Sequence, residues 1–155
     1  MEPVQVDGID QLKELIGQEL GPSDWLEITQ QDIDRFADVS RDHQWIHVDP
    51  ERAAKESPYG ATVAHGNLTL SLVDSFRPQL IQNRGVKMGI NYGFNKVRFP
   101  AAVPAGTRVR ARAEVLTVDD LGDGWWQVVT KYTIDGEQSE KPVCVAESVG
   151  RALVG

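Results

Sequence analysis

The second half of the chain alternates apolar and polar residues with the two-residue period of a β-strand. Within residues 106–120, Arg108 and Arg110 alternate with Val109 and Ala111, which predicts one face in contact with solvent and one buried face. Similar runs predict three more long strands, at residues 86–99, 125–135 and 141–154. Two hairpin turn signals separate these runs, Gly122-Asp123-Gly124 and Asp135-Gly136. Short connections of this kind indicate an antiparallel sheet.

The most apolar stretch outside these strands runs from Gly66 to about Leu80 and predicts a helix. At about 100° per residue, its large apolar side chains spread over roughly 200° of the circumference. A helix with so wide an apolar surface fits inside a curved partner better than on a flat one. We therefore predict an α+β fold, in which a curved antiparallel sheet wraps around one central buried helix. We expect one domain, residues 1–155.

The first half of the chain predicts shorter elements around an irregular segment. Apolar residues at helical spacing predict a short amphipathic helix over residues 8–17. Thr29 and Asp32 have the spacing of a capping box that starts a second helix. Residues 42–48 predict an irregular segment, and Asp49-Pro50-Glu51 predicts the cap and first turn of another helix.

Composition restricts the classes of function. The chain is 41% hydrophobic and 25% charged, as soluble globular proteins are, and its net charge of −7 argues against nucleic-acid binding, which needs a basic surface. No apolar run approaches the roughly 20 residues that span a bilayer, and the N-terminus lacks the pattern of a signal peptide. The one cysteine, Cys144, lies in an apolar run and predicts a buried thiol. We expect a cytoplasmic protein without membrane attachment.

Candidate chemistry lies in the irregular segment, where Asp42 and His47 stand five positions apart. A carboxylate and an imidazole that share a water molecule can take a proton from it and return one elsewhere, which contributes about 10²–10⁴-fold in rate. Spacing alone favours a structural alternative, in which Asp42 caps a turn and His47 is a half-buried histidine with satisfied hydrogen bonds. His43 is a weaker candidate, because a polar loop residue of this kind usually faces water.

Gly66, at the start of the apolar helix, is a second candidate. Backbone N–H groups at a helix N-terminus lack partners and carry the positive end of the dipole. A glycine would let a carbonyl oxygen approach such a donor, and donors so placed stabilise developing oxyanions. The alternative is a glycine chosen for tight packing. His65 beside it would either contact a ligand or shape the turn.

Motifs for metal or nucleophilic chemistry do not accompany these residues. The three histidines, His43, His47 and His65, have no CxxC pair beside them. Neither a GxSxG nucleophile elbow nor a P-loop occurs in the sequence. We expect neither a metal nor a redox cofactor.

The residues around the pair resemble a known enzyme family. Two segments resemble motifs of the (R)-specific enoyl-CoA hydratases, the hydratase 2 or MaoC-like dehydratase family with the hot-dog fold: residues 42–50 and Ala64-His65-Gly66. Four residues keep the family's type and spacing: Asp42, Ile46, His47 and Ala53. Three depart from it, Arg41 at the motif Gly, Gln44 at the Asn and Trp45 at the Pro. Residues 91–100 are similar to a strand of the short single-domain mycobacterial hydratases, and the likeness covers about residues 25–150.

The resemblance implies (R)-specific hydration of a trans-2-enoyl-CoA to an (R)-3-hydroxyacyl-CoA, a reversible reaction. Asp42 and His47 would activate a water that adds to C3 and return a proton to C2, and the Gly66 N–H would polarise the thioester oxygen. His65 and Arg98 would be substrate contacts, with Arg98 at the coenzyme-A phosphates or, alternatively, a solvated or structural arginine. Coenzyme A enters with the substrate, so no cofactor is implied.

The resemblance also implies a homodimer, because hot-dog domains usually join their sheets side by side and pairing removes an open sheet edge. Two other functions fit the same fold. A hot-dog acyl-CoA thioesterase would hydrolyse the thioester bond, although the spacing of Asp42 and His47 speaks against it. A non-catalytic acyl-CoA-binding module would bind the substrate without turnover, and the retained pair argues against that.

Overall fold

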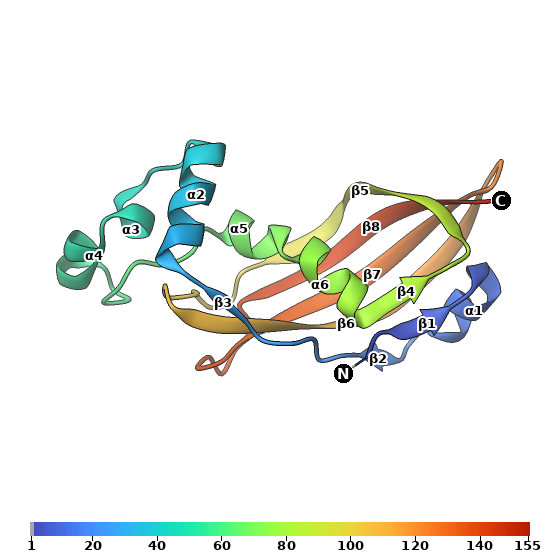
Figure 1. The fold of residues 1–155 in the computed structure, drawn as a ribbon, viewed down its shortest axis with the longest axis horizontal. Coiled ribbons are helices and arrows are strands. Elements are labelled where there is room, and N and C mark those ends of the chain that lie inside the picture. The colour runs from blue at the N-terminus through green and yellow to red at the C-terminus, as the bar shows by residue number, and fades with distance from the viewer. Residues whose placement is uncertain (1) are drawn as a thin grey trace.

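The computed structural model describes residues 2–155 and is dominated by one curved antiparallel sheet (Figure 1). The spatial order of its main path is β2-β6-β7-β8-β5, with β3 paired to β6 beside β2. Its strands are β2 (Glu19–Leu20), β3 (Leu26–Ile28), β5 (Val86–Arg98), β6 (Thr107–Gly122), β7 (Trp125–Gly136) and β8 (Cys144–Val154). The four long strands match the predicted ones to within a few residues at each end, and the α+β fold is confirmed.

The connection of the sheet is only partly a meander. Strands β6, β7 and β8 are neighbours in space as in sequence, whereas β5 pairs with β8 and lies at the far edge. The residues between β5 and β6 therefore cross from one edge of the sheet to the other. On β6 the predicted alternation is confirmed, because Val109 and Ala111 are fully buried while Arg108 faces outward and pairs with Glu137.

The predicted central helix is present as two consecutive helices, α5 (Gly66–Ser71) and α6 (Val73–Leu80). They meet at Leu72, where the Leu72 N–H donates to the Thr69 carbonyl at 3.1 Å, a bond of the tighter 3₁₀ type. Their apolar side faces the sheet, and Phe76 is fully buried. A single apolar run does not reveal such a break, since both segments bury the same kind of residue.

Short elements complete the N-terminal half. Helix α1 (Gly8–Glu14) confirms the predicted amphipathic helix, and β1 (Val4–Val6) pairs in parallel with β4 (Ile81–Asn83). Helix α2 (Gln30–Ser40) begins with the predicted capping box of Thr29 and Asp32. Helix α4 (Pro50–Glu56) begins at Pro50, as predicted. Among the described residues, no helix is long and apolar enough to cross a membrane.

The prediction of an irregular segment over residues 42–48 is wrong in its second half, where α3 (Trp45–Val48) forms one helical turn. Four residues are too few to show a helical period in the sequence. Helices α2, α3 and α4, with their connections, make up residues 29–65, here called the helical lobe. The lobe lies at one end of the sheet, on the left of Figure 1, whereas α1 lies at the other end.

Candidate active site

The candidate residues meet where the helical lobe joins the start of α5. Asp42 follows the C-terminal end of α2, His47 lies in α3, and His65 and Gly66 form the N-cap and first residue of α5. Segments far apart in the sequence thus converge on one corner of the molecule. The structure brings together four of the five predicted site residues.

Asp42 and His47 face one another. Their atoms Oδ2 and Nε2 are 4.0 Å apart, and the Asp42 side chain is 53% exposed while that of His47 is 9% exposed. The distance is too long for a direct hydrogen bond and short enough for both groups to bind one water molecule. The pair therefore consists of a solvent-facing carboxylate and a buried imidazole.

The hydrogen bonds of His47 place its proton. Nδ1 lies 2.7 Å from the Val63 carbonyl oxygen, which can only accept, so Nδ1 carries the hydrogen. In the neutral ring Nε2 then bears the free lone pair, and Nε2 is the atom that faces Asp42. The Gln30 amide donates to the His47 carbonyl at 2.8 Å and fixes the backbone as well. This arrangement prepares His47 to accept a proton.

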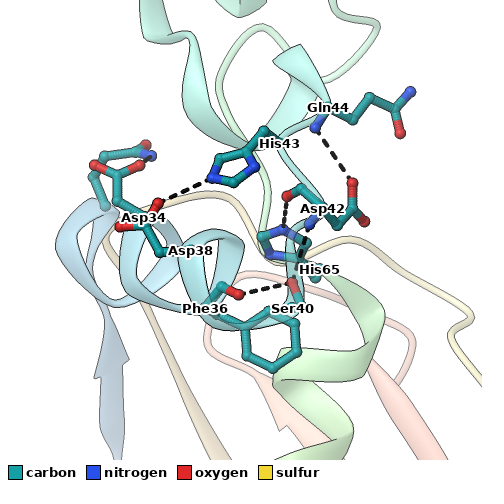
Figure 2. A network of polar contacts seen from close by, with 9 residues as sticks. Asp34, Phe36, Asp38, Ser40, Asp42, His43, Gln44 and His65 are labelled. Carbon is teal, nitrogen blue, oxygen red and sulfur yellow. Dashed lines mark hydrogen bonds and ion pairs between the residues drawn. The ribbon is translucent and has the colours of Figure 1, made fainter.

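His65 lies beside this pair and does not line the pocket next to it. Its Nε2 is 2.9 Å from the Asp42 carbonyl oxygen, and Figure 2 marks this contact with a dashed line. Its ring also stacks on that of His47, with centroids 3.8 Å apart. The residue is 3% exposed. Its contacts connect the acid and the imidazole, which is a different position from the substrate contact that the sequence suggested.

Gly66 is packed against Phe99. A Cβ atom built at Gly66 would lie 2.9–3.1 Å from atoms of the Phe99 ring, so any larger residue here would have to displace that ring. As the first residue of α5, Gly66 has an N–H without a partner inside the helix. The close packing on Phe99 agrees with the packing alternative, and the free N–H is in the place that the oxyanion prediction needs.

A mainly apolar pocket of about 360 Å³ opens in front of these groups. His47 and Gly66 both line it, together with apolar or weakly polar side chains such as Ile46, Tyr59, Thr69 and Phe99. An apolar pocket with a few convergent polar groups is typical of a site for a small organic ligand. Its surface suits a hydrocarbon chain whose polar end lies at His47 and Gly66.

The remaining candidates lie outside the pocket. Arg98 is exposed at the end of β5 and its guanidinium donates to the Val97 carbonyl at 2.8 Å. His43 points back to α2, with Nε2 2.9 Å from Asp38 Oδ1 (Figure 2). The HxxxH spacing of His43 and His47, which the sequence-based prediction passed over, therefore does not bring the two rings together.

The residues that depart from the family motif have clear structural positions. Arg41 ends α2 with φ 64° and ψ 21°, a left-handed conformation that glycine adopts most easily. A glycine at this motif position is therefore explained by the backbone. The Trp45 ring lies 4.2 Å from the Arg52 guanidinium and does not line the pocket.

A metal site fits the geometry poorly. Ligand atoms of Asp42, His47 and His65 lie within 4.8 Å of one another. The two imidazole rings are stacked, with an angle of 21° between their planes. Lone pairs in the planes of stacked rings run side by side and cannot converge on one ion about 2.0 Å from each nitrogen. The cluster suits proton transfer better than metal binding.

Cys144 is not placed to act as a nucleophile. It is fully buried in β8, and burial raises the pKa of its thiol to about 11. At neutral pH the thiol stays protonated, and the thiolate is the reactive form.

Sequence reasoning missed the residues that hold the pair in place. Gln30 and the Val63 carbonyl position His47, and Phe99 closes over Gly66. Gln30 directly follows the capping residue Thr29, where any polar residue would fit. A backbone carbonyl leaves no trace in the sequence.

Comparison with known proteins shows the family of the chain. The sequence matches the MaoC like domain family over residues 11–137. It is 50% identical over 145 residues to the 3-hydroxyacyl-thioester dehydratase Z of Mycobacterium tuberculosis, covering 94% of this chain and 95% of that protein. Nodulation protein N of Rhizobium meliloti is also 50% identical over 145 residues, 93% of this chain and 90% of the relative.

Solved structures share the fold. A monoamine oxidase regulatory protein from Archaeoglobus fulgius superimposes with a TM-score of 0.80 at 24% identity, covering 100% of this chain and 99% of that one. The unliganded R-hydratase PhaJ1 from Pseudomonas aeruginosa gives 0.67 at 25% identity, over 90% of this chain and 83% of that one. These neighbours confirm the hot-dog fold. With the match over most of its length, the chain belongs to the MaoC-like dehydratase family.

Proposed function

We propose that the protein catalyses the reversible (R)-specific hydration of trans-2-enoyl-CoA to (R)-3-hydroxyacyl-CoA. One observation carries the proposal: the free Nε2 of His47 faces the Asp42 carboxylate at 4.0 Å beside an apolar pocket that Gly66 also lines. The dehydratase relative supports a 3-hydroxyacyl thioester as the hydrated partner. The solved (R)-hydratases support the stereochemistry.

The steps follow from these positions. Asp42 and His47 bind one water and remove its proton while the water oxygen forms a bond to C3. The C2–C3 π electrons move toward the thioester carbonyl, and the Gly66 N–H stabilises the negative charge that develops on its oxygen. The proton held by the pair then passes to C2. Hydrogen and hydroxyl have been added across the double bond, and the pair returns to its starting state.

The test follows the absorbance of the conjugated enoyl thioester with crotonyl-CoA and with a longer trans-2-enoyl-CoA. Loss of absorbance without release of free thiol, and an (R)-3-hydroxyacyl product on chiral analysis, is the expected result. Thiol release would identify a thioesterase instead. Binding of enoyl-CoA without any change in absorbance would identify a binding module. An (S) product would overturn the stereochemical assignment.

Coenzyme A would be bound outside the pocket, near the end of β5. Arg98 is exposed there, next in sequence to the pocket residue Phe99, and a guanidinium suits a phosphate group. The expected effect of Arg98→Ala is a raised KM for crotonyl-CoA with an unchanged kcat. An unchanged KM would show that Arg98 has no part in binding the substrate.

We propose further that two copies pair through β5. This edge strand carries a row of exposed apolar side chains, Met88, Ile90, Tyr92 and Phe94. An exposed apolar edge invites pairing with another chain. The double substitution Met88→Lys with Ile90→Lys is expected to convert a dimer to a monomer in light scattering, whereas Val39→Lys, on an exposed residue of the lobe, leaves it a dimer. A dimer that survives both changes would refute this interface.

A further inference from the structure

We propose that His65 is a positioning residue for the acid–base pair, a single buried ring that fixes both members without touching substrate. The inference rests on the proposed hydratase function for its kinetic consequence. Its geometric basis stands independently, in contacts that join His65 to Asp42 on one edge and to His47 on one face.

The contact with Asp42 connects an exposed loop to the buried interior. The other side-chain contacts of the Asp42 loop reach only the end of α2 or the loop itself. The Asp42 N–H donates to Ser40 Oγ and the Gln44 N–H donates to Asp42 Oδ1, both at 3.3 Å, and His43 Nε2 lies 2.9 Å from Asp38 Oδ1. These bonds hold the loop to the end of α2 but do not connect it to the start of α5. The His65 Nε2–H reaches across 23 positions of sequence to the Asp42 carbonyl. It therefore ties the Asp42 backbone, which carries the carboxylate, to the start of α5.

The contact with His47 fixes the plane of the imidazole. The Val63 carbonyl holds Nδ1 at one edge, and a ring held at one edge can still tilt about that bond. The His65 ring packs face to face on it at 3.8 Å, which removes this freedom. Phe36 packs against His65 in turn, with ring centroids 4.9 Å apart. The direction of the His47 Nε2 lone pair is thereby determined.

The same contacts determine which nitrogen of His65 carries the hydrogen. The Asp42 carbonyl accepts, so the proton of the neutral His65 ring lies on Nε2. Nδ1 then carries a lone pair and is buried without a partner among the described residues. His65 does not line the pocket. Its removal should therefore leave substrate binding unchanged and affect the chemical step.

Two substitutions separate the two contacts. In His65→Gln the side-chain amide can still donate to the Asp42 carbonyl, but the stacked ring is lost. In His65→Phe the ring can still stack on His47, but the donor is lost. Val115→Ala, a buried change on β6 away from the site, serves as the control for loss of stability alone.

We expect His65→Phe to lower kcat by about 10²-fold, the size of effect that a displacement of about 1 Å in an active site produces, with KM unchanged. His65→Gln should recover part of that loss. Val115→Ala should lower the melting temperature without lowering kcat of the folded enzyme. A His65→Phe enzyme with the wild-type kcat, or a kcat loss matched by an equal rise in KM, would overturn the proposal.

A second readout does not depend on turnover. Amide hydrogen exchange of Gln44, whose N–H donates to Asp42 Oδ1, should speed up in His65→Phe and stay near the wild-type rate in His65→Gln, because only the first variant releases the Asp42 loop. Unchanged exchange in His65→Phe would refute the positioning role. If the wild-type protein fails to hydrate enoyl-CoA but the two variants show this difference in exchange, the proposed function fails. The role of His65 in holding the loop then still stands.

Discussion

The helical lobe and the sheet with its central helices differ in the contacts that bear on the candidate site. The sheet buries large apolar side chains completely, Phe76, Val109 and Ile134 among them. In the lobe the connections that matter for the site are polar: His47 is bonded to Gln30 and Val63, and His65 to Asp42. Apolar burial stabilises a fold without setting directions, whereas hydrogen bonds set directions.

This difference means that stability and activity should respond to different substitutions. A change in the sheet should lower the free energy of unfolding and leave the geometry of the pair intact. A change in the polar connections of the lobe should disturb catalysis more than stability. Each of the following experiments changes one of the two regions and measures both activity and stability where they are expected to differ.

The largest effect is expected at the pair itself. Asp42→Asn and His47→Gln should each lower kcat by about 10²–10⁴-fold, because each removes one partner in proton transfer. Since the Asp42 side chain is 53% exposed, Asp42→Asn should leave the melting temperature nearly unchanged. Steady-state kinetics with crotonyl-CoA and thermal unfolding measure the two effects. Wild-type turnover in either variant would refute the assigned roles.

The opposite outcome is expected in the sheet and its central helices. Phe76→Ala should lower the free energy of unfolding by about 3–5 kcal/mol, since it removes a fully buried aromatic ring and leaves a cavity. At temperatures where the variant remains folded, its kcat should match that of the wild type. Urea unfolding and kinetics at low temperature test this. A large loss of kcat in the folded variant would show that the two regions are coupled.

Gln30 provides a test within the lobe. Its amide donates to the His47 carbonyl and accepts from the Thr62 hydroxyl, so Gln30→Ala should cost about 1–3 kcal/mol and lower kcat. The matched control is Gln5→Ala, which removes an exposed amide contact to Gln82 at 3.0 Å in the pairing of β1 with β4. The control should leave kcat unchanged. Equal effects of both changes would contradict the special position of Gln30.

A smaller effect with opposite sign is expected at Arg41. Its left-handed φ of 64° costs about 1 kcal/mol for a residue with a side chain. Arg41→Gly should therefore raise the free energy of unfolding by about 0.5–1 kcal/mol without affecting turnover, as urea unfolding can show. A destabilised variant would mean that the Arg41 side chain contributes more than its backbone costs.

The smallest effect is a change in stability due to the Cys144 thiol, and it is expected only at alkaline pH. Burial raises the pKa of the thiol from 9.0 to about 11, so the unfolded chain loses this proton at lower pH than the folded one. The contribution of the protonated Cys144 thiol to the free energy of unfolding is complete below pH 9 and declines as the pH rises to 11. Stability of the wild type should therefore fall more steeply over this range than that of Cys144→Ala. Equal slopes in unfolding experiments would contradict the buried, protonated thiol.

Sequence patterns predicted the parts of the fold that depend on local repetition. The alternation around Val109 gave the strand and its faces, and Thr29 with Asp32 gave the start of α2. The patterns did not predict the turn α3 or the break at Leu72, because neither changes the spacing of apolar residues over a long enough window. The position of β5 at the far edge, beside β8, depends on which strands pair in the folded protein, and no local pattern encodes that pairing.

The sequence allowed single site residues to be predicted, but not the contacts between them. Asp42, His47 and Gly66 could be identified by residue type and family resemblance. The stacking of His65 on His47 could not, because 18 positions of sequence separate two rings that the fold brings to 3.8 Å. The same is true of Gln30, whose importance follows only from the position of α3 beside α2.

The contact between His47 and the Val63 carbonyl has a consequence for how the site can vary among relatives. Every amino acid supplies a main-chain carbonyl, so the proton on Nδ1 is set by the path of the backbone and not by the identity of residue 63. The Val63 side chain, which lines the pocket, is therefore free to change with the shape of the substrate. Substrate preference can diverge at this position while the proton chemistry is inherited unchanged.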